Sequence, residues 1–411
     1  MTSISSQDRD THANEPEDPE DFRGYVRDIL AGRLTPRDPD QPPSLFGIRD
    51  NADPLGRGRK YLETMADVGW ATPRWPRELG GAGFTAAQAT ILSEELLRFE
   101  VPDLYPFDIG LRMVAAVLLK HGNDEQRARW LEDIRLGEQV WAQLFSEPEA
   151  GSDLAGLVTR ARRENDGWRI KGHKIWSSRA PYASWGFLLA RTDENVAKHA
   201  GITAFALDLS TPGVDIHELR QMNGDAHFAE VFLDDVFVPD DCRLGEVNEG
   251  WRVAMTTLSN ERAGLRTTGL GLKSTRVLNS LLSQTSEPVL RAEVIDAFVE
   301  LEVAQLTSAR AAAKMARGAQ PGPEGSGEKL RNGNAMRRLM DVALRVQGAG
   351  GLVDDDFWSA LALTIPSMSI RGGTDEIQKN IIGERILGLP KEPSMGAGVA
   401  FHELRRRTPR R

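Results

Sequence analysis

The chain has 411 residues, of which 40% are hydrophobic and 27% charged, with 39 glycines and 22 prolines. This apolar share is typical of a globular protein and excludes a disordered or fibrous chain. The longest apolar run, Met113 to Leu119, is far shorter than the roughly 20 residues that a membrane-spanning helix needs. The net charge of −9 argues against a nucleic acid as the main partner.

Residues 1–54 are acidic at first and rich in proline and aspartate later, so we expect a flexible acidic N-terminal arm. The first residues lack the basic and apolar stretches of a signal peptide, and the acids argue against a transit peptide. The single cysteine, Cys242, excludes an internal disulfide and fits a reducing compartment. We therefore expect a cytoplasmic protein.

The next two regions differ in character. Residues 55–137 are rich in helix formers and predict an N-terminal helical domain, with a helix that Asp124 caps. Residues 138–245 contain short stretches of β-formers separated by turn residues, and they predict a middle antiparallel β-barrel or sheet domain. The predicted strands lie at 168–176, 186–191, 202–209 and 230–238.

Residues 246–390 are helical again and predict a C-terminal four-helix bundle. We expect a helix break at 320–327 and a helix that starts at Thr374, whose side chain suits an N-cap. Residues 391–411 form a basic tail that we interpret as solvated. The order of domains is therefore helices, sheet and helices, an α+β fold.

Three patterns mimic functional sites. The stretch from Gly269 to Thr275 lacks the spacing of a phosphate loop and predicts a helix. Asp354 to Asp356 is interpreted as a helix start rather than a cation site. The seven histidines are scattered, so we expect no metal.

Two segments favour a ligand site. The stretch from Leu144 to Gly156 contains glycines that allow close backbone approach, and Ser146 and Ser152 that offer hydroxyl groups. In the second segment, Trp176 stands beside two serines at the end of a predicted strand. An indole that stacks, next to hydroxyls that reach heteroatoms, suits a planar aromatic ligand.

Together these segments resemble the signature of the acyl-CoA dehydrogenase family. A third match comprises Gln347–Gly351 and the stretch from Ile370 to Arg385, and a weaker one is Trp75–Gly81. The resemblance covers roughly residues 55–390, with the motifs in the order that the family has.

The resemblance implies an FAD enzyme. Phe145 and Ser146 would lie against the flavin, Trp176 would pack on its rings, and Ser178 would hydrogen-bond near N5. Ser152 would face the pantetheine arm of the substrate. FAD would be shared between the subunits of a dimer or tetramer, held by residues of two chains. The neighbouring subunit's FAD would be contacted by Gln347, Gly350 and Gly351, and the chain's own FAD by Thr374 and Glu376.

The family's reaction removes an α-proton and a β-hydride from an acyl thioester, and the proton needs a carboxylate. Many relatives carry that glutamate just before the Gly-Thr of the last motif, where this chain has Gly372. The second position known for the family falls on Glu261, which taken alone would be interpreted as an ion-pair partner. We therefore assign Glu261 as the base, with Arg262 and Gly372 at the substrate.

One family motif, Arg-x-x-Phe-Gly, is absent from residues 270–291, which favours a partner chain that supplies the missing contact. The resemblance also implies electron transfer to an electron-transfer flavoprotein. CoA and a carrier protein stay open as the source of the thioester. The alternatives are a flavin oxidase or monooxygenase, or a non-catalytic subunit of a heteromeric acyl-CoA dehydrogenase. A further alternative is a nucleic-acid-binding protein of the same superfamily, which only the Arg-rich tail favours.

Overall fold

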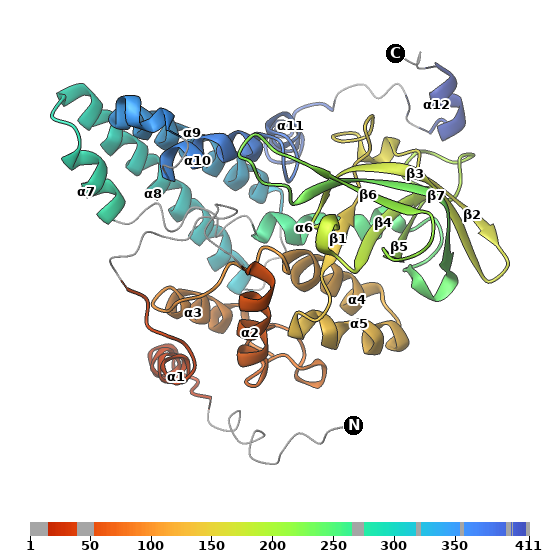
Figure 1. The fold of residues 1–411 in the computed structure, drawn as a ribbon, viewed down its shortest axis with the longest axis horizontal. Helices are drawn as coiled ribbons and strands as arrows, with labels where there is room; N and C mark the ends of the chain where they lie inside the picture. Colours follow the sequence, from red (N-terminus) through yellow and green to blue (C-terminus); the bar gives the residue numbers. More distant parts are fainter. Residues whose placement is uncertain are drawn as a thin grey trace.

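The computed structural model describes residues 15–38, 53–264, 275–317, 322–353, 357–391, 396 and 398–407. A group of N-terminal helices, a twisted sheet and a group of C-terminal helices meet at the centre of the molecule (Figure 1). Helix α6 (Gly250–Gly264) runs between the sheet and the C-terminal helices. The predicted α+β order of helices, sheet and helices is therefore confirmed.

Among its described residues, the N-terminal part contains five α-helices and a short π-helical turn. They are α1 (Pro19–Ala31), α2 (Pro54–Ala66), α3 (Ala86–Leu96), the π-helical η2 (Ile109–Val114), α4 (Ala115–His121) and α5 (Asp124–Leu136). Helices begin where a side chain satisfies the free amide groups of the first turn. In α5 this cap is Asn123 rather than the expected Asp124, because the side-chain Oδ1 of Asn123 accepts from the Gln126 backbone amide at 2.8 Å.

Helix α1 lies within the segment that we expected to be a flexible arm, and for this part the expectation is wrong. Its Phe22, Val26 and Leu30 are buried, at the four-residue spacing of one helix face. Its polar face is held by Glu95 of α3, which is 1% exposed and accepts hydrogen bonds from Arg23 and Arg27. Burial of three large apolar side chains, at about 2 kcal/mol each, outweighs the acidic, proline-rich composition. Residues 1–14 and 39–52 lie outside the described part.

The central sheet has the strand order β6-β7-β3-β2-β4-β5-β8, with β1 beside β4. Most pairs are antiparallel as expected, but β1 and β2 run parallel to β4, so the sheet is mixed. The strands are β1 (Trp141–Leu144), β2 (Arg160–Glu164), β3 (Gly167–Ser178), β4 (Trp185–Arg191), β5 (Ile202–Asp208), β6 (Val214–Leu219), β7 (Phe228–Pro239) and β8 (Arg243–Leu244).

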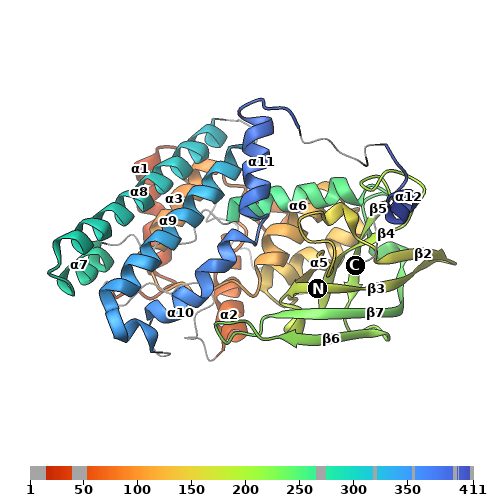
Figure 2. The ribbon, with the colours of Figure 1, turned by 90° about the horizontal axis from the view of Figure 1, so that it is seen from above.

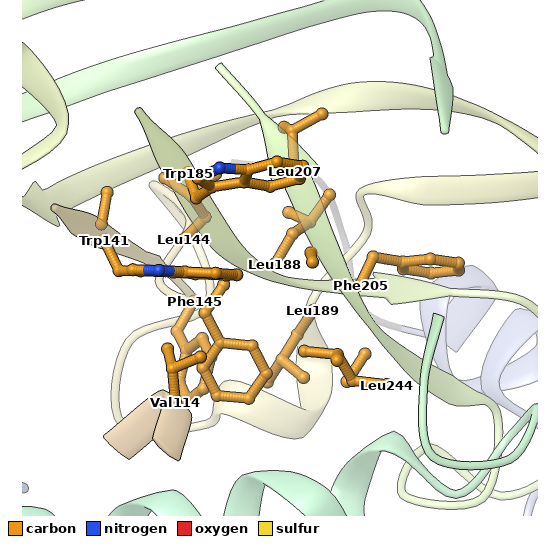
Figure 3. Packing of buried hydrophobic residues seen from close by; sticks show 14 of the residues in the cluster. Val114, Trp141, Leu144, Phe145, Trp185, Leu188, Leu189, Phe205, Leu207 and Leu244 are labelled. Carbon is orange, nitrogen blue, oxygen red and sulfur yellow. The ribbon is translucent and has the colours of Figure 1, made fainter. Parts of the chain in front are cut away.

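The core joins the sheet to the N-terminal helices. Trp141 and Trp185 stack with ring centroids 5.6 Å apart, and Trp130 of α5 meets Trp185 edge-on at 5.3 Å. Strand β4 is buried along its whole length, which explains its continuous apolar run. Figure 3 shows Phe145 among these core side chains, a placement that matters for the site below.

The C-terminal helices pack around α9, with α8 along one side and α10 and α11 on others (Figure 2). They are α7 (Thr275–Ser283), α8 (Pro288–Ala316), α9 (Glu324–Gln347), the 3-10 turn η8 (Gly348–Leu352), α10 (Phe357–Thr364) and α11 (Asp375–Arg385). The expected break at 320–327 is shorter than predicted, since α9 already begins at Glu324. The stretches 269–274 and 354–356 lie outside the described part.

Helix α12 (Phe401–Arg407) follows far from these helices and lies against the sheet domain (Figure 1). The interpretation of the tail as solvated is therefore wrong for residues 400–407, because Phe401 is buried at 4% exposure. Residues 408–411 lie outside the described part. Within the described ranges, no helix is long and apolar enough to cross a membrane. The same residues contain no group of histidine, cysteine, aspartate or glutamate side chains that could hold a metal ion.

Candidate active site

The structure brings the first two signature segments side by side. The chain leaves β1 at Leu144 and turns through Phe145–Ala150, while β3 ends at Ser178. The Ile175 amide donates to the Ser146 carbonyl at 3.0 Å, which fixes the turn against the end of β3. A surface formed by two backbones held in this way is preorganised for a ligand.

A buried ion pair that sequence reasoning missed locks this arrangement. Lys174 is fully buried, and its Nζ donates to Glu147 Oε1 at 2.8 Å and to the Phe145 carbonyl at 3.1 Å. Glu147 also accepts from the amides of Val158 and Thr159, at 2.6 and 2.9 Å. Burial alone would raise the pKa of Glu147, but the Lys174 charge and these hydrogen bonds lower it overall. Glu147 therefore stays ionised and ties three segments together.

Trp176 has the features of a stacking surface. It is 57% exposed, although the large apolar residues of β3 are otherwise mostly covered, and its φ of +55° lies in the left-handed region. That conformation is unfavourable for a bulky residue and recurs at functional sites. The Phe228 ring supports the indole edge-on at 6.0 Å. The exposed indole and this strained backbone fit a planar ring system such as a flavin.

Serine side chains lie directly beside Trp176. Ser177 is fully buried, and its Oγ has no hydrogen-bond partner among the described residues. Ser178 pairs with Phe228 at the end of the β3–β7 ladder. An unpartnered buried hydroxyl is costly and is explained when a bound group supplies its partner.

Replacing Trp176 by alanine should weaken binding of the flavin that the sequence resemblance implies by up to about tenfold, because loss of one aromatic stacking partner typically costs about 0.5–1.5 kcal/mol. The measurement is the flavin dissociation constant, taken from quenching of flavin fluorescence with the apoprotein. Trp176→Phe keeps a stacking ring and serves as the matched control. An unchanged constant in Trp176→Ala would remove the indole from the cofactor site.

Phe145 is placed differently from the expectation. Its side chain is 4% exposed and meets Phe187 at a centroid distance of 5.1 Å within the core (Figure 3). Its carbonyl is already bound by Lys174. The Phe145 ring is therefore covered by core side chains, and its contact with a flavin stays a prediction.

The last motif forms a rigid loop before α11. Gly372 and Gly373 have φ values of +67° and +87°, where glycine carries no steric penalty. Gln378 Nε2 donates to both of their carbonyls, at 3.0 and 3.1 Å. Thr374 caps α11 as predicted, accepting from the Ile377 amide at 3.3 Å. Glu376 is exposed in the first turn of the helix.

A cluster at the end of β3 lies within electrostatic range of Arg371 in this loop. Arg179 follows Ser178, donates to the Tyr105 carbonyl at 2.7 Å and lies 3.4 Å from the centroid of the Tyr105 ring. Tyr105 in turn meets His227 edge-on at 5.0 Å. Arg371 lies close enough to affect the charges of Tyr105 and His227. Sequence reasoning missed this cluster, because its members are far apart in the chain.

The cluster makes stability depend on pH. Burial, with Arg179 and Arg371 adding to it, lowers the pKa of His227 to about 4. The folded state therefore holds neutral His227, and the unfolded state takes up a proton below its ordinary pKa of about 6.5. Neutral His227 should therefore contribute about 3 kcal/mol to the free energy of unfolding above pH 6.5. This contribution should be lost as the pH falls towards 4.

Denaturant unfolding at several pH values measures this effect. Between pH 6.5 and 4, the free energy of unfolding should change less steeply with pH in the variant His227→Gln than in the unmodified chain. Equal slopes for the two proteins would assign the pH dependence to other groups.

Gln347, Gly350 and Gly351 do not join the other site residues. Lys329, near the start of α9, pairs with Asp375 of α11 at 3.0 Å. Gln347 follows Lys329 by 18 residues, which is about 27 Å along the helix axis. It lies beside α7, where its amide donates to Gln284 at 2.9 Å. One chain therefore presents two separate groups of site residues.

Ser152 is exposed in the loop after β1, next to Asp153, which pairs with Lys198 at 2.6 Å. Helix α6 carries Glu261 and Arg262 in its last turns, on the side of the molecule where α6 meets α9. The side chains of both residues lie outside the described part, so their roles stay predictions.

Comparison with known proteins identifies the family. Models of the N-terminal, middle and C-terminal domains of acyl-CoA dehydrogenase match residues 16–138, 142–236 and 248–387. Over 386 residues the chain is 35% identical to "Acyl-CoA dehydrogenase IpdE1" of Mycobacterium tuberculosis, covering 92% of this chain and 99% of that protein. Over 340 residues it is 41% identical to "Acyl-CoA dehydrogenase FadE34" of the same organism, covering 81% of this chain and 46% of that protein. The chain thus spans about half the length of FadE34.

A solved structure described as "Tcur3481-Tcur3483 steroid ACAD" has the same fold, with a TM-score of 0.76 and 24% identity. The match covers 92% of this chain and 99% of that one. The chain belongs to the acyl-CoA dehydrogenase family, whose members are FAD-dependent oxidoreductases.

Proposed function

We propose that the protein catalyses FAD-dependent α,β-dehydrogenation of an acyl thioester. The observation that carries this proposal is the exposed Trp176 at the end of β3, next to a cluster of Arg179, Tyr105 and His227 on which the charge of Arg371, from the Gly372 loop, acts. Helix α6 approaches the same region from between the sheet and the C-terminal helices. A stacking surface, hydroxyls and a helix that carries a glutamate are the parts that this reaction needs.

Each residue then has a stated task. Trp176, Ser178 and Ser146 would hold the flavin, and Thr374 and Glu376 would hold the same FAD from α11. The bound flavin supplies the hydride acceptor. Glu261 takes the α-proton, and the Gly372 amide donates to the thioester carbonyl, where negative charge develops. Ser152 and Arg262 contact the substrate outside the reacting atoms.

The second group of residues supports an oligomer. Gln347, Gly350 and Gly351 lie too far from α11 to reach the same FAD, so they would contact the FAD of a second subunit. Helix α8 also presents an exposed apolar row at helical spacing, which fits a subunit contact: Ile295, Val299, Val303 and Leu306. We propose a dimer or tetramer. The absent Arg-x-x-Phe-Gly motif and the two-chain name of the steroid ACAD favour a heteromer.

Gly372 also bears on the acyl group. With hydrogen in place of a side chain, the loop leaves room above the α-carbon for a branched or bulky acyl chain. The steroid ACAD named above supports thioesters of this bulky kind as substrates. An electron-transfer flavoprotein is the proposed acceptor, and the thioester is carried on CoA. The second candidate, a flavin oxidase of the same fold, predicts fast reaction with oxygen.

The test starts from purified protein and its flavin spectrum. Anaerobic titration with straight, branched and steroid-type acyl-CoAs should bleach the flavin, most strongly with a bulky thioester. Bleaching followed by rapid oxygen consumption would favour the oxidase. Bound flavin that no thioester bleaches would favour a non-catalytic subunit, and co-purification with a related chain would support the heteromer.

A further inference from the structure

An ionic cluster that the proposed mechanism does not use lies at the end of the loop before α11. Asp375 is 6% exposed, and its two carboxylate oxygens accept hydrogen bonds from Lys329 Nζ and Arg337 Nη2, both at 3.0 Å. Both cations belong to α9, which lies beside α11 (Figure 2). We call Lys329, Arg337 and Asp375 the Asp375 cluster. It ties the first residue of α11 to a different helix of the C-terminal part.

Arg337 holds both ends of this loop. Besides Asp375, its guanidinium donates to the hydroxyl of Ser369, the last residue of the 3-10 turn η9 (Ile365–Ser369). Residues 370–374 therefore lie between two contacts of one side chain. A guanidinium is planar and presents its donors in a fixed arrangement, so it keeps two acceptors in a defined relative position.

The carboxylate of the cluster is charged at neutral pH. Burial alone would raise the pKa of Asp375, but the hydrogen bonds and charges of Lys329 and Arg337 lower it overall. Asp375 also lies in the first turn of α11, where the helix dipole favours a negative charge. Both cations therefore keep an ionised partner at neutral pH.

The loop between the two contacts presents free amide groups. Gln378 is 1% exposed and binds the carbonyls of Gly372 and Gly373. A Cβ at Gly373 would lie 2.6 Å from Gln378 Nε2, so this close approach requires glycine. Within the described ranges, the backbone amides of both glycines have no hydrogen-bond acceptor. Amides that are free while the carbonyls are bound form a donor site for a carbonyl oxygen.

Two consecutive glycines need support from outside the loop. Glycine loses more conformational freedom on folding than any other residue, so the chain itself determines the direction of these amides only weakly. Stabilisation of a developing oxyanion depends on donors that are fixed before the reaction, and a displacement of about 1 Å can cost on the order of a hundredfold in rate. Contacts with the rest of the protein must therefore set the direction of the amides.

We propose that the Asp375 cluster positions the Gly372 amide for its hydrogen bond to the thioester carbonyl. Lys329, Arg337 and Asp375 are positioning residues, which act through the loop and not on the reacting atoms. The inference rests on the proposed function for the identity of the group that the amide binds. The cluster should therefore affect the rate of flavin reduction more than the affinity for the thioester.

The test compares two neighbouring arginines of α9. Arg337→Gln removes the contact with both ends of the loop and leaves the buried Lys329–Asp375 pair, so this variant should fold. Arg338→Gln is the matched control, because Arg338 is the next residue and pairs with acids of α8 instead.

Anaerobic stopped-flow spectroscopy uses the acyl-CoA that bleaches the flavin most strongly. The limiting rate of flavin reduction, per bound flavin, should fall about ten- to hundredfold in Arg337→Gln. The dissociation constant of the acyl-CoA should change by less than about threefold, because the lost interaction belongs mainly to the transition state. Arg338→Gln should match the unmodified protein in both quantities.

A second measurement detects the hydrogen bond without turnover. An aromatic enoyl-CoA such as cinnamoyl-CoA absorbs at longer wavelength when a hydrogen bond polarises its thioester carbonyl. This red shift should appear when the ligand binds to the unmodified protein or to Arg338→Gln, and it should be smaller in Arg337→Gln. A purely structural role of the cluster would change the amount of folded protein and not the shift per bound ligand.

Equal reduction rates and equal red shifts in the two variants would overturn the inference. A loss of folded or flavin-loaded protein in Arg337→Gln, with a normal red shift in the fraction that remains, would also overturn it. The same holds if the unmodified protein produces no red shift, since the hydrogen bond would then be absent. If no thioester bleaches the flavin, the proposed function fails, while the red shift of the bound enoyl-CoA still tests the positioning.

Discussion

Replacing Glu261 by glutamine should slow reduction of the flavin by acyl-CoA about a hundred- to ten-thousandfold, the usual loss when a positioned base is removed. Glutamine keeps the size of the side chain and cannot accept the α-proton. Flavin content and CoA affinity should stay near those of the unmodified protein. Anaerobic stopped-flow spectroscopy of the reductive half-reaction gives the rate directly.

Glu249→Gln is the matched control for this change. Glu249 precedes the same helix and pairs with Arg252 at 2.7 Å, at the end far from the proposed active site. Its variant should reduce the flavin at the normal rate. Unchanged bleaching in Glu261→Gln would contradict the assignment of the base.

Moving the carboxylate to Gly372 should not simply restore activity. Gly372 has a φ of +67°, which costs about 1 kcal/mol or more for any residue with a Cβ. The double variant Glu261→Gln/Gly372→Glu should therefore recover only part of the lost rate. Full recovery would show that the loop adapts to a side chain at this position.

Replacing Lys174 by methionine should destabilise the protein by about 3–5 kcal/mol, since Glu147 would keep a buried charge without its partner. The turn Phe145–Ala150 would lose its anchor at the Phe145 carbonyl, so flavin should be released at lower denaturant concentration. Denaturant unfolding followed by intrinsic and flavin fluorescence measures both effects.

Two further variants separate the ion pair from general damage to β3. Lys171→Met removes an exposed lysine from the same strand, whose Asp234 partner is 79% exposed, and should cost less than about 1 kcal/mol. Lys174→Met/Glu147→Met removes both charges and should recover much of the loss. Equal stability of Lys174→Met and Lys171→Met would show that the pair does not hold the turn.

The sequence predicted those elements whose own residues decide their form. Helix α3 and helix α5 have strong helix formers, and β3 and β7 are rich in β-formers between turn residues, so local preference and final structure agree. Helix α1 was missed, because its stability comes from Glu95 and from apolar burial against the rest of the N-terminal domain. Strand β2 was missed since four of its five residues are charged and mostly exposed.

The site shows the same division. Trp176 was found because an unusual residue stands in a short motif, and its exposure supports a role at the surface. The burial of the Phe145 ring was not predicted, since a motif cannot say which side of the backbone faces the core. The cluster of Arg179, Tyr105 and His227 forms only when the chain folds. Its members are so far apart in the sequence that no local motif predicts their contact.

The length of α9 predicts how two different inactive variants behave when they are mixed. Trp176 lies at the end of β3, and Gly350 follows the end of α9 that is about 27 Å or more from Lys329. In an assembly that shares cofactors between subunits, a chain defective at one end and a chain defective at the other would still form one intact site. Two inactive variants, refolded together, would then regain part of their activity by complementation.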